Sequence, residues 1–260
     1  MDQPVEYDAF AEIYDVWTET APVAGPNLHF YVEEYMRSPL PVVELGIGNG
    51  RIALEAALQG KPMVGVDSSQ QMLRLCRERA QAAGVGHLLS LIQADFRDFE
   101  LAEPAQLITI PFHTIGHLLT LEDKCAALRH ICSQLAPGGR LIFDTFVFNP
   151  EYAQAHNNVA TLRAEYADPL SGQDILLWVT SRYQFKTQAM RIITWTDELN
   201  QHGELEHRKY RFLSFSWIEP EQVRALLKET GYLVESVYGD FQRHALKENS
   251  PEQVWVARKT

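Results

Sequence analysis

The sequence predicts an α/β fold in which a mostly parallel, doubly wound sheet carries an antiparallel β insertion after its fifth strand. Short, continuously apolar runs alternate with helical patterns over the first 150 residues, and this spacing requires crossover connections, which join parallel strands. Glycines crowd the turn after the first run. Beyond residue 150 the runs become longer and more polar, as expected of an antiparallel sheet with one solvated face.

The first half of the chain predicts five strands separated by helices. The strands are expected at residues 41–46, 62–67, 89–95, 106–112 and 141–146. Helices are expected at residues 51–60, 69–84 and 121–135, the last one stopped by the segment APGGR. Either Ser68 or Ser69 is suited to cap the second helix, and Gly84 to end it.

The second half predicts a separate layer and then the return of the chain to the core. Strands are expected at residues 161–168, 173–185, 188–199 and 204–216, with a helix at 219–231 and two closing strands at 232–241 and 252–259. The predicted core is therefore residues 1–150 with 217–260. Residues 151–216 form the antiparallel insertion, which we expect to cover the substrate and to be a candidate homodimer contact.

Composition narrows the range of functions. The chain of 260 residues has a net charge of −11 and no basic stripe, which argues against a nucleic-acid partner. The cysteines and histidines lack metal-ligand spacing, so no metal is predicted. The acidic N-terminus does not resemble a signal peptide, and no apolar run is long enough to span a membrane. These features predict a cytoplasmic protein without a membrane partner.

The glycine turn after the first strand is the main functional signal. Gly46, Gly48 and Gly50 form a G-x-G-x-G pattern, and Arg51 stands where a dinucleotide fingerprint has its last glycine. Asp67 ends the second strand, where a carboxylate can accept hydrogen bonds from a ribose diol.

Two more acids accompany that turn. Asp95 ends the third strand beside Phe96, so its carboxylate could accept from an adenine amino group while the aromatic ring packs on the base. Glu44 lies inside the first strand and needs donors there. It is expected to brace the glycine turn or to meet a ligand ammonium group.

The segments VVELGIGNGR, MVGVDSSQQML, IQADFRDF and LAPGGRLIFD together resemble the class I S-adenosylmethionine-dependent methyltransferases. The resemblance covers nearly the whole chain and implies a Rossmann-like seven-stranded sheet with S-adenosyl-L-methionine as the cofactor. It implies that the three glycines line the methionine part, that Asp67 holds the ribose, and that Ser68 and Met72 flank the adenosine. The remaining cofactor contacts expected on this basis are Tyr14, Glu44, Arg51, Ala94, Asp95, Phe96, Pro111 and His113.

The same resemblance suggests where the methyl acceptor binds. Tyr14, in YDAFAEIYDVW, is expected to close over the methyl donor as part of a lid helix and to be one of the catalytic groups. The insertion resembles those of small-molecule N-methyltransferases, among them amino-sugar N,N-dimethyltransferases and, more distantly, glycine N-methyltransferase. His117, in IPFHTIGHL, matches the S-I-G-H-L stretch of the amino-sugar enzymes and is expected to act as base or orienter. The predicted substrate contacts are His117, Trp178, Arg191, Trp195, Tyr210 and Phe241.

These observations predict in-line transfer of a methyl group to a small-molecule acceptor, with an amine nitrogen favoured. The chain lacks the D/N-P-P-Y motif of several nucleobase and protein amino-group methyltransferases, which argues against methylation of adenine in DNA. Two alternatives stay open. The fold could serve non-methyl chemistry such as a cyclisation, or it could bind the cofactor without turnover. A nicotinamide-dependent dehydrogenase is disfavoured by Arg51.

Overall fold

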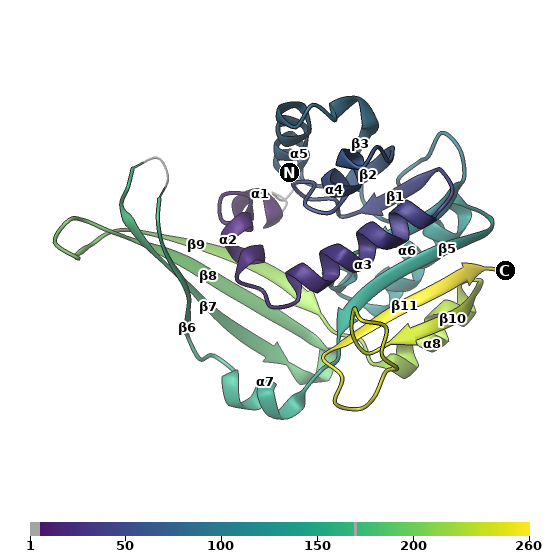
Figure 1. The fold of residues 1–260 in the computed structure, drawn as a ribbon. Coiled ribbons are helices and arrows are strands. Elements are labelled where there is room, and N and C mark those ends of the chain that lie inside the picture. The colour runs from purple at the N-terminus through teal and green to yellow at the C-terminus, as the bar shows by residue number, and fades with distance from the viewer. Residues whose placement is uncertain (1–5, 169–170) are drawn as a thin grey trace. The chain divides into compact units, whose positions relative to one another are not determined.

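The computed structural model describes residues 6–168 and 171–260, which form two compact units (Figure 1). The core unit comprises Val23–Phe148 and Trp217–Thr260, and the insertion unit comprises Asn149–Ser216 with the described residues up to Pro22. The sequence predicts that residues 1–22 belong to the core, whereas the described part of this segment, residues 6–22, groups with the insertion strands. The reason is packing, since Phe10 and Ile13 are buried against Leu177 and Leu213.

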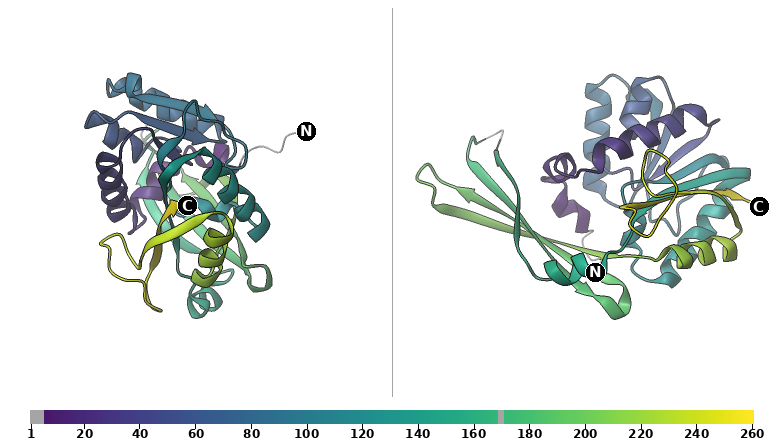
Figure 2. Two further views of the ribbon diagram at one scale, coloured as in Figure 1. Left: turned by 90° about the vertical axis from the view of Figure 1, so that its right-hand side faces the viewer. Right: turned by 60° about the horizontal axis from the view of Figure 1, so that its bottom comes forward.

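The core unit is built on one seven-stranded sheet, as predicted. Its strand order is β10-β11-β5-β4-β1-β2-β3. The strands are β1 (Val42–Leu45), β2 (Met63–Asp67), β3 (Leu89–Gln93), β4 (Ala105–Ile110), β5 (Leu135–Phe146), β10 (Tyr232–Tyr238) and β11 (Glu252–Lys259). β11, which ends at the C-terminus marked in Figure 2, pairs antiparallel with both β5 and β10, and the other neighbours pair parallel.

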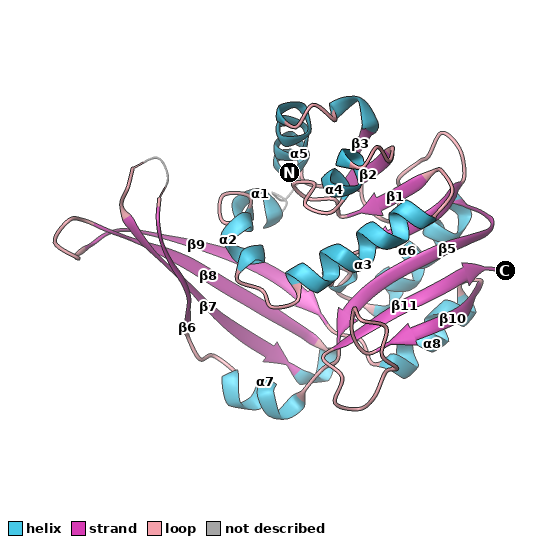
Figure 3. Cartoon of the chain, in the orientation of Figure 1, coloured by secondary structure: helices cyan, strands magenta, loops and turns pink. Residues whose placement is uncertain are grey.

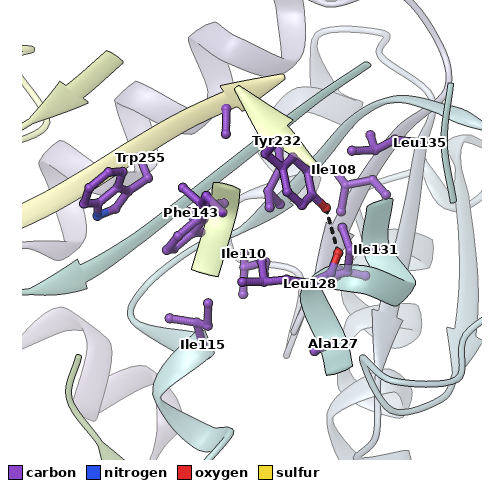
Figure 4. Packing of buried hydrophobic residues seen from close by; sticks show 14 of the residues in the cluster. Ile108, Ile110, Ile115, Ala127, Leu128, Ile131, Leu135, Phe143, Tyr232 and Trp255 are labelled. Atoms are coloured by element: carbon purple, nitrogen blue, oxygen red, sulfur yellow. Dashed lines mark hydrogen bonds between the residues drawn. The ribbon is translucent and has the colours of Figure 1, made fainter. Parts of the chain in front are cut away.

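Helices cover both faces of this sheet, which makes it doubly wound. One face packs against α3 (Ala24–Arg37), α4 (Ala53–Leu58) and α5 (Gln70–Ala82). The other packs against α6 (Leu121–Gln134) and α8 (Pro220–Glu229). Figure 4 shows part of this second layer, where the hydroxyl of Tyr232 donates to the carbonyl of Leu128 at 3.0 Å.

The predicted strands and helices of the core are confirmed with small shifts, but two features differ. The sequence does not predict α3, which supplies Tyr31 and Tyr35 to the core. The segment APGGR does not separate helix from strand, because β5 already begins at Leu135 and pairs with Ala105 of β4. The short elements η1 (Gly86–Leu88) and η2 (Thr114–His117) complete the unit.

The insertion unit is a four-stranded antiparallel sheet of order β6-β7-β8-β9 (Figure 3). Its strands agree with the prediction and are β6 (Thr161–Ala167), β7 (Asp174–Gln184), β8 (Ala189–Leu199) and β9 (Leu205–Ser216). The short helices α1 (Glu6–Phe10), α2 (Tyr14–Glu19) and α7 (Pro150–His156), with η3 (Phe185–Thr187), accompany it. No helix of the described residues is both long and apolar enough to cross a membrane.

Candidate active site

The glycine turn packs directly against the segment that follows β4. Gly46, Gly48 and Gly50 have φ of +68°, +56° and +87°. Residues with a side chain rarely adopt this left-handed backbone conformation. A Cβ at Gly46 would overlap the Cγ2 of Thr114. The predicted donor loop and the predicted acceptor loop are therefore neighbours within the core unit.

Gly46→Ala is expected to destabilise the protein by about 1–2 kcal/mol for the left-handed backbone and by a further 1–3 kcal/mol, roughly, for overpacking against Thr114. Gly60→Ala is the matched control, because Gly60 has a φ of +85° but nothing within 4 Å of its added Cβ. Denaturant unfolding compares the two variants. Adding Thr114→Ser, which removes Cγ2, should rescue part of the loss in Gly46→Ala, and equal losses at the two glycines would contradict the packing argument.

Asp67 joins the glycine turn to α5. Its Oδ2 accepts the N–H of Gly48 and its Oδ1 accepts the N–H of Ser69, each at 2.8 Å. Ser69 is also the N-cap of α5, since its hydroxyl accepts the amide of Met72 at 3.1 Å. An ionised carboxylate can accept about four hydrogen bonds, so a diol is a chemically suitable further donor.

The two other residues predicted to flank the adenosine, Ser68 and Met72, differ in exposure. Ser68 is exposed beside Asp67, whereas Met72 has no exposed surface and lies in the interior. A contact between Met72 and the adenosine would require that side chain to become exposed.

The residues after β3 are engaged with their own neighbours. Ala94 and Phe96 are partly buried and pack against the core layer of α6 and α8. Arg97 donates to both oxygens of Asp95, at 2.7 and 3.0 Å, and also to Asp123 at 2.8 Å. The carboxylate of Asp95 is therefore in a bidentate ion pair, with which an adenine amino group would have to compete.

Glu44 is buried in β1 and held by a hydroxyl network. The hydroxyl of Tyr35 donates to its Oε2 at 2.9 Å and also lies 2.8 Å from the hydroxyl of Thr109. Burial raises the pKa of Glu44 to about 8, although the hydrogen bond from Tyr35 and the charge of Arg51 oppose the rise. Glu44 thus links β1 to α3 and β4, beside the glycine turn.

A buried carboxylate that the sequence reasoning misses holds the end of β4. Phe112 and His113 have φ of +59° and +61°, which is uncommon for non-glycine residues. Asp144, on β5, accepts the N–H of Phe112 at Oδ1 and the N–H of His113 at Oδ2, both at 2.9 Å. Tyr31 donates to the same Oδ1 at 2.6 Å. An acid inside the apolar run LIFDTF is the signal that could have identified Asp144.

Arg51 ties this cluster to the glycine turn. It donates to the carbonyl of Ala24 at 2.9 Å and to the side chain of Asn27 at 2.8 Å, and Asn27 in turn donates to Asp144 at 3.3 Å. The guanidinium carbon of Arg51 lies 4.7 Å from the centre of the Phe112 ring. Its Nε is buried without a hydrogen-bond partner, so one donor remains for a ligand.

The ring of His113 lies between two carboxylates from other strands. Its Nε2 is 2.6 Å from Oε2 of Glu252 and 3.7 Å from Oδ2 of Asp144. Burial lowers the pKa of His113, but the charge and hydrogen bond of Glu252, with the charge of Asp144, outweigh it and raise the pKa above its ordinary value. The side chains of His113, Glu252 and Asp144 thus form one cluster at the end of β4.

Two further predicted residues belong to the same segment. Pro111 is buried and follows β4 directly, and His117 is the last residue of η2 and is partly buried. Sequence prediction thus gathers Pro111, His113 and His117 correctly in one loop, but it misses Asp144 and Glu252, which hold that loop.

Four predicted substrate residues lie on one face of the insertion sheet. Trp178, Trp195 and Tyr210 are cross-strand partners, and Arg191 is on the same face of β8. The opposite face carries Leu177, Ile192 and Leu213, which pack against the N-terminal helices.

Tyr14 begins the second of these helices, and its ring lies 6.3 Å from that of Tyr7. Tyr7 packs with the apolar cluster on the Leu177 face of the sheet. The sheet therefore lies between the N-terminal helices and the Trp178–Trp195–Tyr210 row. The roles of Tyr14 at the donor and of the row at the acceptor stay predictions.

Phe241 belongs to the hydrophobic core. It is 5% exposed, and its ring lies 5.7 Å from Phe30 and 6.3 Å from Tyr31. The loop before β11 therefore anchors α3. A contact between Phe241 and a substrate stays a prediction, and it would require this side chain to become exposed.

Comparison with known proteins relates part of the core unit to a known domain family. Residues 42–139 match the methyltransferase domain family. The core unit thus contains a region that matches a methyltransferase domain. The cofactor that the sequence predicts for such a domain is S-adenosylmethionine.

Relatives extend the match beyond the domain. A methyltransferase relative from Geobacillus sp. (strain WCH70) is 23% identical over 97% of this chain and 99% of its own. Relatives from Bacillus, described only as uncharacterized methyltransferases, are also 23% identical, and there the chain spans 66% of their length.

Solved structures share the fold of the whole chain. The CcbJ methyltransferase from Streptomyces caelestis superposes with a TM-score of 0.82 over 100% of both chains at 23% identity. CalS10 from Micromonospora echinaspora, an amino pentose methyltransferase solved with its methyl donor, has a TM-score of 0.70 at 18% identity, covering 95% of this chain and 97% of its own.

The core unit contains groups that suit this cofactor. The carboxylate of Asp67 suits the ribose hydroxyls, and the unpartnered Nε of Arg51 suits the carboxylate of the methionine part. Glu44 supplies a buried acid beside the turn. These fits come from the chemistry of the groups that lie at the carboxyl ends of neighbouring parallel strands, where such sheets bind ligands.

Proposed function

We propose that this methyltransferase transfers a methyl group to an amine nitrogen of a small molecule. The carrying observation is the negative charge of the carboxylates of Asp144 and Glu252 around His113, in the loop that also contains His117. A field of this sign favours a cationic ammonium acceptor over an anionic one. The structures of CalS10, an amino pentose methyltransferase, and of KedS8, a sugar N-methyltransferase, support the same class of acceptor.

The chain's own residues would supply position and proton handling. S-adenosylmethionine supplies the methyl group from its sulfonium and leaves as S-adenosylhomocysteine. Asp67 and Arg51 would fix the two ends of this donor against the glycine turn. The segment after β4, clamped by Asp144, would hold the acceptor in line, which can contribute roughly 7–11 kcal/mol in ideal cases.

A panel of acceptors tests the proposal. The purified protein is incubated with S-adenosylmethionine and glucosamine, a 3-amino sugar, tyramine, phenol or acetoacetate, and release of S-adenosylhomocysteine and the product mass are followed. We expect turnover with amines only. Turnover with phenol or acetoacetate alone would contradict the amine assignment, and donor binding without release on any acceptor would favour the cyclisation or binding-module alternatives.

His117→Ala is expected to lower kcat by about tenfold or more while the affinity for S-adenosylmethionine stays within about twofold, because a group that acts only on the acceptor contributes to the chemical step. His87→Ala is the control, since His87 is exposed in η1. Steady-state kinetics and calorimetry measure the two quantities. A kcat within about twofold of the parent enzyme would remove His117 from the acceptor site.

A further inference from the structure

We infer that His113 is the proton acceptor for the amine and that Glu252 is the residue that positions it. The inference rests on the proposed function, and it leaves His117 the role of orienting the acceptor. The sequence around the glycine turn and after β4 gives no sign that His113 contacts Glu252, which lies on another strand.

The hydrogen bond to Glu252 determines which ring nitrogen of His113 can act. Glu252 accepts from Nε2 at 2.6 Å, so in the neutral imidazole the proton resides on Nε2 and the lone pair on Nδ1. Among the described residues, Nδ1 has no hydrogen-bond partner, and the side chain of His113 is 22% exposed. A carboxylate that fixes the tautomer while the other nitrogen faces the reactant is the arrangement of a general base.

The backbone of His113 is fixed as firmly as its ring. Asp144 holds its N–H at 2.9 Å in the left-handed conformation. The ring of Phe112 lies parallel to it with centres 6.0 Å apart, and the ring of Phe146 meets it edge-on at 5.7 Å. These contacts leave the imidazole little freedom to rotate, so Nδ1 keeps one direction in the loop whose next residue, Thr114, packs against Gly46.

The proton transfer balances without any further reactant. One N–H proton of the ammonium moves to Nδ1 of His113, and the electron pair of that bond stays on the nitrogen. This pair forms the new bond to the methyl carbon, while the electrons of the broken carbon–sulfur bond remain on the sulfur of S-adenosylhomocysteine. The imidazolium then releases its proton to water.

The groups that face His113 set the pH range in which it works. These are Glu252 on β11, Asp144 on β5 with Tyr31 of α3 bonded to it, and Arg51, which stacks on the neighbouring Phe112. The carboxylates outweigh burial and raise the pKa of His113 above its ordinary value, so the neutral base forms at higher pH than in an ordinary histidine. The pH profile of kcat/KM should therefore have a rising limb, and the pKa of His113 should set its midpoint.

Two variants and two kinds of measurement test the inference. His113→Asn suits the left-handed backbone, which asparagine tolerates, and Glu252→Gln keeps the shape while removing the charge. Glu248→Gln, on the exposed loop before β11, is the matched control for charge. The pH profile of kcat/KM is measured with the amine that the panel identifies, and the ring resonances of the histidines are titrated by NMR in protein without ligand.

The expected results separate this inference from the proposed function. His113→Asn should lower kcat by about 10²–10⁴-fold and abolish the rising limb, whereas His117→Ala should keep that limb. Glu252→Gln should move both the limb and the NMR titration of His113 to lower pH by about one unit or more, and Glu248→Gln should move neither. If His113→Asn methylates the amine as fast as the parent enzyme, or if Glu252→Gln does not change the pH at which the His113 ring titrates, the inference is wrong but the proposed function is not. Failure to methylate any amine would overturn both.

Discussion

Asp67→Ala is expected to weaken binding of S-adenosylmethionine and S-adenosylhomocysteine by at least about 100-fold. A hydrogen bond to a charged group contributes about 1.5–3 kcal/mol, and about 2.7 kcal/mol corresponds to a hundredfold change in affinity. The substitution also removes the acceptor for the N–H groups of Gly48 and Ser69, so the turn itself would lose its anchor. Isothermal calorimetry with the purified protein measures the affinity directly.

Glu103→Ala is the matched control for this loss of charge. Glu103 is exposed two residues before β4 begins, and Asp67 is the last residue of β2, so the two acids lie at opposite ends of parallel strands. The thermal midpoint of both variants shows whether Asp67→Ala is still folded. A folded Asp67→Ala protein with unchanged affinity for the donor would remove the ribose assignment and, with it, the whole donor site.

Replacing Glu44 by Gln is expected to change how the stability depends on pH. The pKa of Glu44 is raised by burial from 4.5 to about 8, so the folded state binds this proton more tightly than the unfolded chain does. The resulting contribution to the free energy of unfolding is fully present below pH 4.5 and is lost as the pH rises through about 8. Its slope in that window is of order 1 kcal/mol per pH unit. Glu44→Gln, which carries no ionisable proton, should lack this decline.

Denaturant unfolding at several pH values measures the effect. The difference in free energy between Glu44→Gln and the parent protein should grow from pH 4.5 to 8 and then level off. Glu55→Gln, an exposed position on α4, is the control and should follow the parent curve. Parallel curves for the parent and Glu44→Gln would show that the Glu44 carboxyl ionises as readily in the folded protein as in the unfolded one.

The strands of both sheets are predictable because their patterns are local. Continuous apolar runs predict the buried parallel strands, and longer mixed runs predict β6–β9. α3 escapes prediction since Gly25 and Pro26 read as loop residues, although proline is tolerated in the first turn of a helix. The grouping of residues 1–22 with the insertion also depends on tertiary burial of Phe10 and Ile13, which no local pattern reveals.

The candidate site is predictable only where function follows a motif. The glycines, Asp67 and the two histidines after β4 are found from short segments. Asp144 and Glu252 are not, because they meet His113 from positions 31 and 139 residues away. Their contact depends on the register in which β4, β5 and β11 pair. The sequence likewise does not predict on which face of the insertion sheet Trp178 lies, because a shift of one residue in the strand register exchanges the two faces.

The hydrogen bonds that Asp144 accepts from main-chain N–H groups bear on which residues of this loop can change during evolution. Because the carboxylate binds the peptide backbone at 112 and 113 rather than any side chain there, the path of the loop is specified from the neighbouring strand. Side chains that tolerate the left-handed backbone at those two positions can be exchanged during evolution or design while Asp144 keeps the loop on its path. The path of the loop and the chemistry of its side chains are thereby encoded at separate positions of the chain.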